Sequence, residues 1–506
     1  MFIRRKPNKS GSFSVQVLDK RNGRNVLLRS FGSSRDEAVL SELEKLASDF
    51  ITGYGGQGVL TFEDDRLSSA EEAEAFFSRI TDIRHDAPLQ ILGRVYDGIG
   101  FSAIGDDTLR SLAIARVCEP KSKVATVEYL KHCFREDYHL HHIYRYMDTL
   151  YNTRREMIQE ISVGHTRKLL GGRIGIVFYD VTTLYFESAR EDVLRSPGFS
   201  KDGKTSESQI VLGLLVSRNG YPLSYNIFNG TQYEGRTMIP IIDDFVQRFS
   251  LTDFIVVADA GLLSRKNIML LKQAGYKFIL GGRIKKESKS VQEWVLSLPK
   301  DPHVLSETVI NGDERIIVSY SEQRAAKDRH NRDKGIQRLR KAYSSGKISK
   351  RNVNQRGYNK FLVIENDVMV SIDEKKIAAD AQWDGLKSYV TNTDLAAGEV
   401  IDQYHGLWVV ERAFRITKGP LEARPIFHFT ERRIEAHICI CFVAYKLYKE
   451  LERILRLLGI GLSVDKVLNI AKTISTVSIR LDDGTTHIRT LLNTPEEKLL
   501  APLLPS

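Results

Sequence analysis

The sequence has few cysteines and no long apolar segment. Its four cysteines are too few for a disulfide framework in 506 residues, so we interpret them as buried free thiols: Cys118, Cys133, Cys439 and Cys441. No stretch approaches the ~20 consecutive apolar residues of a membrane-spanning helix. The basic residues at positions 1–6 are not followed by the apolar segment of a secretory signal. We therefore expect a cytoplasmic protein that does not bind membranes.

Charge is nearly balanced over the whole chain but unevenly distributed. The formal net charge is +10, yet residues 1–40 and 324–360 are clearly basic, whereas residues 63–82 are acidic. Such basic segments suit a polyanion, most simply nucleic acid. A charge run taken alone is more often a solvated protein surface. The charges therefore favour a DNA partner without establishing one.

Two small regions precede the main part of the chain. Residues 1–33 alternate polar and apolar positions around a turn at Asn22-Gly23, which predicts a β-hairpin, and a helix capped by Ser33 or Ser34 is expected to complete a module of residues 1–52. This basic sheet-plus-helix module either binds DNA or is a structural appendage. Residues 53–87 begin with a Gly-x-Gly-x-x-Gly pattern, but it follows a helix rather than a strand. We interpret that region as an acidic linker and not as a nucleotide site.

Residues 88–170 have the apolar periodicity of helices and predict a helical domain. The region also contains five possible zinc ligands, which are His132, Cys133, His139, His141 and His142. Their spacing matches no standard zinc finger, so a zinc site is a minor alternative.

Residues 171–283 have the pattern of a buried mixed sheet. Two short apolar runs, at positions 174–179 and 254–258, each end on an aspartate, Asp180 and Asp259. A predicted hairpin and helix lie between them, and a helix and a fifth strand follow. This order is that of a ribonuclease-H-like core, an α/β fold with a mixed five-stranded sheet and flanking helices. Because the first and fourth strands of that fold are neighbours, we expect the two aspartates to lie together.

The rest of the chain is expected to complete this core. Residues 284–392 are predicted to form a mainly β, basic insertion, and residues 393–456 to supply the last catalytic and packing helices. Residues 457–506 are predicted to form a helical tail.

A single helix is predicted over residues 397–418, ending at Gly419-Pro420. Side chains spaced four and three apart share one face of this helix: Tyr404, Trp408, Glu411, Arg415 and Lys418. A purely structural helix would place aliphatic residues there. We therefore predict that this face turns toward the two aspartates and that Glu411 completes a three-carboxylate cluster. The alternative is a solvated helix in which Glu411 pairs with Arg415.

The spacing Tyr404-x2-Leu407-x3-Glu411-x6-Lys418 resembles the Tyr-x2-Arg-x3-Glu-x6-Lys signature of a large superfamily of bacterial insertion-sequence DDE transposases. Leu407 stands where arginine is usual, and Arg412 or Arg415 could replace it. Further segments resemble one subgroup of these enzymes, namely residues 178–183, 198–204, 211–216, 257–261, 424–428 and 433–439. The resemblance implies a DNA transposase that cleaves the ends of its element and joins them to target DNA.

The resemblance also implies metal-dependent phosphoryl transfer at Asp180, Asp259 and Glu411. These carboxylates would hold two ions of Mg²⁺ or Mn²⁺, because such ions prefer hard oxygen ligands. Asp180 would bridge both ions. The residues expected to contact DNA are Tyr404, Arg415, Lys418, Lys201 and Lys204. The implied partners are the terminal inverted repeats and target DNA, bound by a homodimer in the bacterial nucleoid.

Four other side chains attract attention in the sequence. Trp383 and Trp408 either stack on an unpaired base or, more simply, pack in the core. His428 and His437 match the subgroup's pattern, but no mechanistic role follows from it.

Three other functions fit parts of the pattern. A nuclease of the same fold would hydrolyse DNA without joining it. A domesticated DNA-binding protein would not need the three carboxylates. A carboxylate-based glycosidase would leave the basic insertion unexplained. The helix signature and the long interval before Glu411 favour the transposase.

Overall fold

The computed structural model describes residues 1–505 except positions 22, 54–68, 189, 199–205, 233–235, 250, 252, 349–351, 355–356 and 366–368. Lys201 and Lys204, together with most of the predicted acidic linker, therefore lie outside the described residues. The chain divides into two compact units, Met1–Thr81 with Ile479–Thr485, and Asp82–Ser478 with Thr486–Ser506. In the described ranges, no helix is both long and apolar enough to cross a membrane.

The first unit contains a small sheet with a helix packed on it. The sheet has the order β1-β2-β3, and its elements are β1 (Phe2–Pro7), β2 (Phe13–Arg21), β3 (Arg24–Ser34) and α1 (Glu37–Gly53), with α2 (Ser69–Ser78) after the linker. The predicted hairpin is β2–β3, and β1 adds a third strand. Val15, Val17 and Leu40 form its buried core. Asp36 caps α1, because its Oδ1 accepts the Ala38 N–H at 2.8 Å, whereas Ser33 and Ser34 belong to β3.

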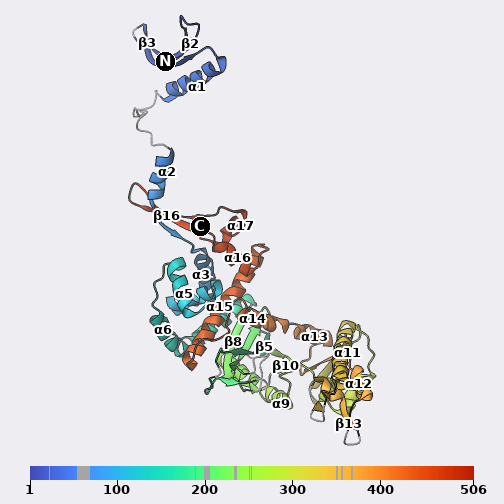
Figure 1. Cartoon of the computed structure of the whole chain (residues 1–506). Helices are drawn as coiled ribbons and strands as arrows, with labels where there is room; N and C mark the ends of the chain where they lie inside the picture. The colour runs from blue at the N-terminus through green and yellow to red at the C-terminus, as the bar shows by residue number, and fades with distance from the viewer. Residues whose placement is uncertain are drawn as a thin grey trace. The chain divides into compact units, whose positions relative to one another are not determined.

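Helices of residues 87–169 pack against one long helix (Figure 1). These helices are α3 (Ala87–Ile99), α4 (Asp107–Cys118), α5 (Lys123–Tyr129), α6 (Leu140–Thr153) and α7 (Arg155–Leu169). They contact α15 (Glu431–Leu457), which is buried along most of its length and also touches the sheet at β8. A helix that is apolar on most sides has to be covered on most sides, and this one joins the helical domain to the sheet.

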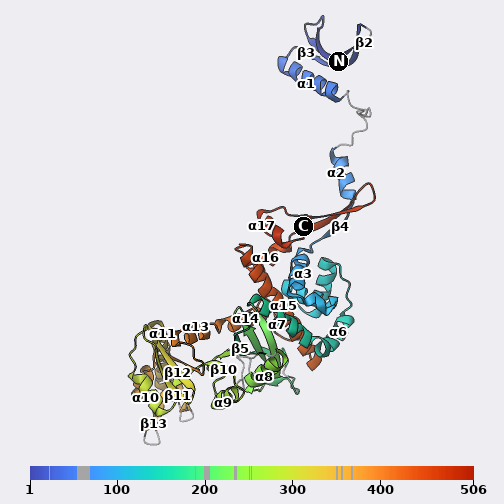
Figure 2. The ribbon, with the colours of Figure 1, turned by 180° about the vertical axis from the view of Figure 1, so that it is seen from behind.

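The central sheet contains the five strands that the sequence predicts, in the predicted order. They are β5 (Ile176–Tyr185), β7 (Ser208–Ser217), β8 (Pro222–Asn229), β9 (Ile255–Ala258) and β10 (Lys277–Gly281). They run β10-β9-β5-β7, with β8 paired to β7, so the first and fourth strands are parallel neighbours. The helices α8 (Met238–Phe249) and α9 (Arg265–Gln273) lie on one side of this sheet (Figure 2).

The sheet is larger than five strands, which corrects the prediction of a separate insertion. Beyond β10 it continues through β15 (Leu386–Thr391), β12 (Glu314–Tyr320) and β11 (Ser306–Asn311), and a short β6 (Ser196–Pro197) pairs with β7. Without β15, the outer edge of β10 would leave its backbone groups unpaired. Three strands of the region 284–392 therefore belong to the core sheet.

The prediction that this region is mainly β is also wrong. It contains α10 (Lys289–Ser297), α11 (Glu322–Ser344) and α12 (Glu374–Ala381), besides the hairpin of β13 (Leu362–Glu365) and β14 (Met369–Ile372). The basic stretch 324–341 is the helix α11, which the Ser321 side chain caps. Only a few apolar residues of α11, such as Ile336 and Leu339, are buried. Because most residues of α11 are charged or polar, its sequence lacks the apolar periodicity from which a helix is usually predicted.

Two further predictions about the end of the chain need correction. The predicted helix 397–418 is two helices, α13 (Ala397–His405) and α14 (Trp408–Lys418). The predicted helical tail contains α16 (Val464–Ala471) and α17 (Pro495–Lys498), but also the strands β16 (Ser475–Arg480) and β17 (Thr486–Leu491). Both strands are rich in Thr, Val and Ile, residues that favour extended backbone.

Candidate active site

Asp180 and Asp259 lie next to each other on neighbouring parallel strands. The last paired residues of β5 and β9 are Tyr179 and Ala258, so the two aspartates follow at the same level. Adjacent strands are about 4.8 Å apart. Asp180 lies within β5 rather than at its end, because β5 continues to Tyr185 while β9 stops at Ala258.

Both aspartates belong to the face of the sheet that α14 covers. Side chains alternate along a strand, so Asp180 shares its face with Phe178, and Asp259 shares its face with Val257. Phe178 and Val257 belong to the same apolar cluster as Val410 of α14. The carboxylates therefore point to the side of the sheet that carries Glu411.

Helix α14 runs along β5, with its start near Phe178 and the loop after it near Tyr185. A Cβ on Gly406 would lie 2.5 Å from Cζ of Phe178, and the Ile426 N–H donates to the Tyr185 carbonyl at 3.0 Å. Glu411 is five residues beyond Gly406, about 7.5 Å along a helix. Asp180 is two residues beyond Phe178, about 7 Å along a strand. Glu411 and Asp180 thus lie at similar distances along the chain from the contact between Gly406 and Phe178.

The junction at Gly406 and Leu407 explains why the predicted single helix is broken. Here the backbone hydrogen bonds tighten to three-residue spacing, with Leu407 N–H donating to Tyr404 and Val409 N–H donating to Gly406, each at 3.0 Å. Only glycine lets the chain approach Phe178 this closely. The five predicted side chains therefore do not form one continuous stripe.

The side chains near this junction differ in exposure. Trp408 is 57% exposed, so the prediction that it packs in the core is wrong, whereas Leu407 is buried in the apolar cluster. Arg412 pairs with Glu452 and is not free to replace the usual arginine. Arg415 is exposed and has no ion pair among the residues that the structure describes.

Tyr404 lies near two of the three carboxylates, Asp259 and Glu411. A Cβ on Gly281 would lie 2.4 Å from its hydroxyl, so the glycine makes room for it. Burial, and next the charge of Asp259, raise the pKa of the Tyr404 hydroxyl, and Glu411 adds to this. The hydroxyl therefore stays protonated and can donate to an anionic oxygen.

Lys387 of β15 adds a cation beside Tyr404. Its Nζ lies 4.4 Å from the centre of the Tyr404 ring and 5.1 Å from that of Tyr389. Burial and the charge of Arg324 lower the pKa of Lys387, whereas Glu411 raises it. Glu411 and Lys387 are thus close enough to influence each other.

The turn after β9 holds Asp259 in place. Its Oδ1 accepts the N–H of Gly261 at 2.8 Å and that of Leu262 at 3.2 Å, and Arg283 donates to the Gly261 carbonyl at 2.8 Å. Asp180 Oδ1 accepts the Val181 N–H at 2.7 Å. Both carboxylates are therefore oriented by backbone N–H groups of the residues that follow them in the chain.

The donor set suits a hard divalent cation, because all three candidate ligands are carboxylates. In the part of the chain that the structure describes, however, no group of three or more histidine, cysteine or acidic side chains is close enough to hold a metal ion. The prediction of a closed three-carboxylate cluster is therefore not met. The two aspartates are neighbours, and Glu411 lies exposed on the helix opposite them.

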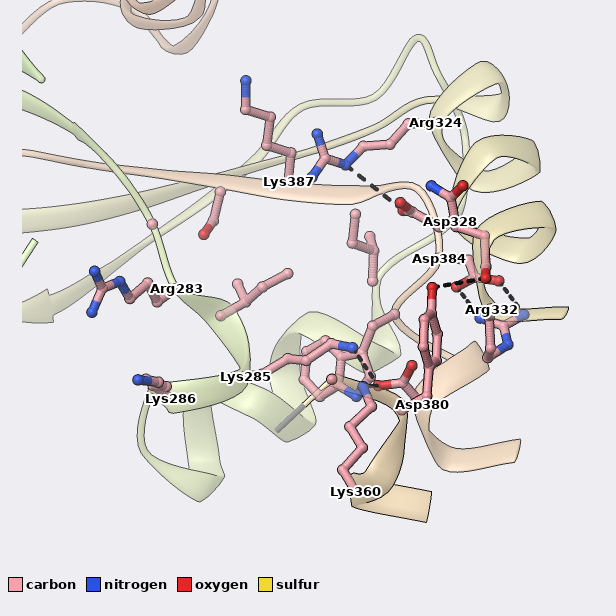
Figure 3. A pocket seen from close by; sticks show the side chains of 18 residues that line it. Arg283, Lys285, Lys286, Arg324, Asp328, Arg332, Lys360, Asp380, Asp384 and Lys387 are labelled. Atoms are coloured by element: carbon pink, nitrogen blue, oxygen red, sulfur yellow. Dashed lines mark hydrogen bonds and ion pairs between the residues drawn. The ribbon is translucent and has the colours of Figure 1, made fainter. Parts of the chain in front are cut away.

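A basic cleft of about 700 Å³ adjoins this site (Figure 3). The charged residues that line the cleft are Arg283, Lys285, Lys286, Arg324, Asp328, Arg332, Lys360, Asp380, Asp384 and Lys387. Arg283 and Lys387 belong to both the cleft and the surroundings of Asp259 and Tyr404. The cleft thus extends the site toward α11.

The remaining predicted residues are distributed around this site. Lys418 ends α14, and Trp383 packs half-buried against the sheet core. His139, His141 and His142 contact one another, with ring centres 3.9–5.6 Å apart. They form no metal-holding group in the described ranges.

Sequence reasoning missed Lys387 and Arg283. Lys387 is a half-buried cation in an otherwise uncharged strand, on the same face as Tyr389. Arg283 follows Gly281-Gly282, where added Cβ atoms would meet Tyr404 and Ser388. Two signals were available in the sequence. One is a lysine within a predicted buried strand, and the other is a Gly-Gly pair directly before an arginine.

A family model described as "Transposase DDE domain" matches residues 171–447. The chain belongs to this family. The matched range includes both aspartate strands and α14 of this DDE transposase. A comparison with curated proteins returned no match.

Solved structures give only a distant likeness. The piggyBac transposase synaptic complex with hairpin DNA is 10% identical, covers 79% of each chain and has a TM-score of 0.40. The Mos1 transposase paired-end complex with left transposon end is 11% identical, covers 47% of this chain and 66% of that chain, and has a TM-score of 0.16. The family assignment therefore rests on the matched sequence.

Proposed function

We propose that this DDE transposase cleaves DNA at the ends of an insertion sequence and transfers the freed 3′ ends to target DNA at Asp180, Asp259 and Glu411. The observation that carries the proposal is the parallel pairing of β5 and β9, which puts the two aspartates side by side beneath the helix of Glu411. In this proposal the sheet is a ribonuclease-H-like core extended at one edge.

The three carboxylates are the residues that would hold Mg²⁺ or Mn²⁺ in this active site. Bound there, two such ions would activate the attacking oxygen and stabilise the leaving oxygen. Asp180, on the central strand, would be among the residues that hold these ions.

The other residues of the site would position the DNA. The protonated Tyr404 hydroxyl donates to a phosphate oxygen, and Lys387 supplies positive charge beside it. The basic cleft provides a path for the phosphate backbone next to the cleaved bond. Arg415, Lys418, Lys201 and Lys204 are further proposed DNA contacts.

The test is cleavage and joining of a supercoiled plasmid that carries the source element. Asp180→Asn, Asp259→Asn and Glu411→Gln are each expected to lower strand cleavage by at least about 100-fold while DNA binding persists. Asp402→Asn is the matched control, because it removes an exposed carboxylate of the preceding helix α13. Gel analysis of nicked and joined products with and without Mg²⁺ measures both steps.

Three results separate the competing functions. Metal-dependent cleavage and joining, lost in the three variants and kept in Asp402→Asn, support the transposase. Cleavage without joining would indicate a nuclease of the same fold. DNA binding with an inert wild type would favour a non-catalytic DNA-binding protein.

Two wider parts of the proposal concern assembly. The basic three-stranded sheet of the first unit is proposed to recognise the inverted repeats. Two copies of the chain are proposed to bring the two ends together.

A further inference from the structure

A second group of basic side chains lies away from the carboxylates, in the helical domain. Arg116 of α4 and Lys123 of α5 are 6% and 5% exposed. His428, in the loop after α14, and His437 of α15 are 8% and 4% exposed. Four separate segments thus bring four buried basic side chains to one place.

Within the part of the chain that the structure describes, no acidic side chain pairs with these four. Among the residues that the structure describes, no hydrogen bond or ion pair joins Arg116 or Lys123 to another group. His437 Nε2 lies 3.1 Å from the Ala423 carbonyl, while its Nδ1 is buried without a partner within the described part of the chain. The nearby Arg433 is paired with Asp148 at 2.7 Å, so that carboxylate is already neutralised.

Their electrostatic effects show that the four groups are close together. Burial, and next the charge of Arg116, lower the pKa of Lys123 to about 7. Burial, and next the charges of Lys123 and Arg116, lower the pKa of His428 to about 3. Packing cations together without an anion is unfavourable, and an anion among them would reverse both effects.

The same side chains line a cavity of about 110 Å³. Since about 10–15 Å³ of such a cavity is enough for one water molecule, this cavity has room for several waters or for one tetrahedral oxyanion. Exposed Lys121, Glu422 and Phe427 also line it, so the cavity opens to the surface. Glu422 is its only acidic lining residue in the described ranges.

We propose that Arg116, Lys123, His428 and His437 form an oxyanion site that takes one phosphate group. Arginine and lysine donate charge-assisted hydrogen bonds to such a group, and the histidines complete the donor set when they are protonated. The site is separate from the carboxylates and does not depend on transposase activity.

The phosphate has two possible sources with the same chemistry, a free oxyanion or a DNA backbone. The Ile426 segment next to the cavity pairs with Phe186 at the far end of β5. Asp180 lies five residues before Tyr185, about 17 Å along the strand. A duplex bound at the carboxylates would reach that far within about five base pairs. Phe427 at the cavity mouth is 57% exposed and could stack on an unpaired base.

The first experiment measures oxyanion binding with sulfate as the probe. The melting temperature of the full chain is followed with increasing sulfate, against chloride at equal ionic strength. We expect a saturable rise for the wild type, as for any ligand that binds only the folded chain. Lys123→Met and Arg116→Met are expected to weaken the sulfate affinity by about tenfold to a hundredfold.

Lys446→Met is the matched control. Lys446 is also fully buried, but its Nζ donates to the Ser162 carbonyl at 2.9 Å and to Thr166 at 2.6 Å, away from the cavity. It should keep the wild-type sulfate affinity. Phosphorus NMR of inorganic phosphate with the wild type, displaced by sulfate, tests the site even if a variant does not fold. A sulfate response that is unsaturable and equal in all variants, without displacement of phosphate, would overturn the proposal.

The second experiment identifies the source of the phosphate. Binding of a random-sequence DNA duplex is measured against chloride concentration for the wild type and Lys123→Met. If a backbone phosphate occupies the site, the slope of log affinity against log salt falls by about 0.9 in the variant, and sulfate competes with DNA. If the slope is unchanged while sulfate binding is lost, a free oxyanion is the occupant.

Discussion

The basic cleft beside α11 and the oxyanion cavity beside α5 are built from the same kinds of residue. They differ in whether their cations are paired with carboxylates. In the cleft, Arg332 and Asp384 form two hydrogen bonds of 2.5 and 2.7 Å, and Asp380 accepts from Lys285 and Lys360 at 2.7 and 2.9 Å (Figure 3). In the cavity, the two most buried cations have no such partner in the described residues.

This difference distinguishes basic side chains that are paired with carboxylates in the folded chain from buried cations that can be paired only by a bound anion. A cation beside a carboxylate is compensated in the folded chain and contributes to local order. A buried cation without one is unfavourable unless an anion arrives from outside. The number of basic residues in a cleft is therefore a weaker indication of binding than the number that remain uncompensated.

Leu407→Arg would create an uncompensated cation deliberately, and it should have the largest effect on stability. It restores the usual signature residue, but Leu407 is 7% exposed in an apolar cluster. We expect the free energy of unfolding to fall by about 4 kcal/mol, because a buried charge lacks a partner there. Urea unfolding measures it, with Leu407→Met as the control. A stable Leu407→Arg variant would show that the arginine finds an anion or reaches water.

Asp384→Asn would convert a compensated cation of the cleft into an uncompensated one. Because Arg332 and Asp384 keep some contact with water, we expect a loss of about 3 kcal/mol, at the lower end for a broken buried pair. The double variant Arg332→Met/Asp384→Leu should recover part of this loss in the same unfolding measurement. An unchanged stability of Asp384→Asn would remove the distinction between the two regions.

Lys123→Met would remove an uncompensated cation from the cavity. In chloride at pH 6 we expect the variant to be more stable than the wild type by about 1 kcal/mol, since methionine fills a similar volume without a charge. Adding sulfate should reverse the order. Thermal unfolding in the two salts checks this, and a variant less stable than the wild type in chloride would mean that the lysine is already compensated.

The pH dependence of stability gives the most specific effect. The pKa of Lys123 falls from 10.5 to about 7 in the folded chain. As the pH rises above 7, the unfolded chain keeps a proton that the folded chain has lost, so the free energy of unfolding increases.

This increase should be weaker in Lys123→Met, and sulfate should diminish it in the wild type. The comparison is made at pH 7 to 9 by urea unfolding. The other charged and titratable groups around Lys123 are unchanged between the two proteins, namely Arg116, Lys121, Tyr144, Glu422, Arg424, His428, Arg433, His437 and Cys441. Parallel pH profiles would show that Lys123 does not titrate in this range.

The sequence allowed the aspartate strands to be predicted because their signal is local. The apolar runs before Asp180 and Asp259 are typical of buried strands, and the order of elements predicts that they pair. The position of Glu411 followed from helical spacing. The break at Gly406 did not, because it depends on the approach of Phe178 from a distant strand.

Other features depend on contacts that no local pattern contains. The strands added beyond β10 pair across more than a hundred residues, as between Ile279 and Thr391. The oxyanion cavity combines Arg116, Lys123, His428 and His437, whose buried positions become evident only when α4, α5 and α15 pack together. His428 and His437 were noticed in the sequence, but their cationic neighbours were not.

The attachment of α14 to β5 has a mechanical consequence. Gly406 fixes the start of the helix on Phe178, and Ile426 fixes the loop after it on Tyr185 and Phe186. Both ends of the helix are therefore attached to the same strand. Val410, Ala413 and Phe414 of α14 are buried in the same apolar cluster as Phe178, so the helix is held against the sheet along its length as well. The backbone position of Glu411 relative to Asp180 is therefore set by the packing of one helix on one strand.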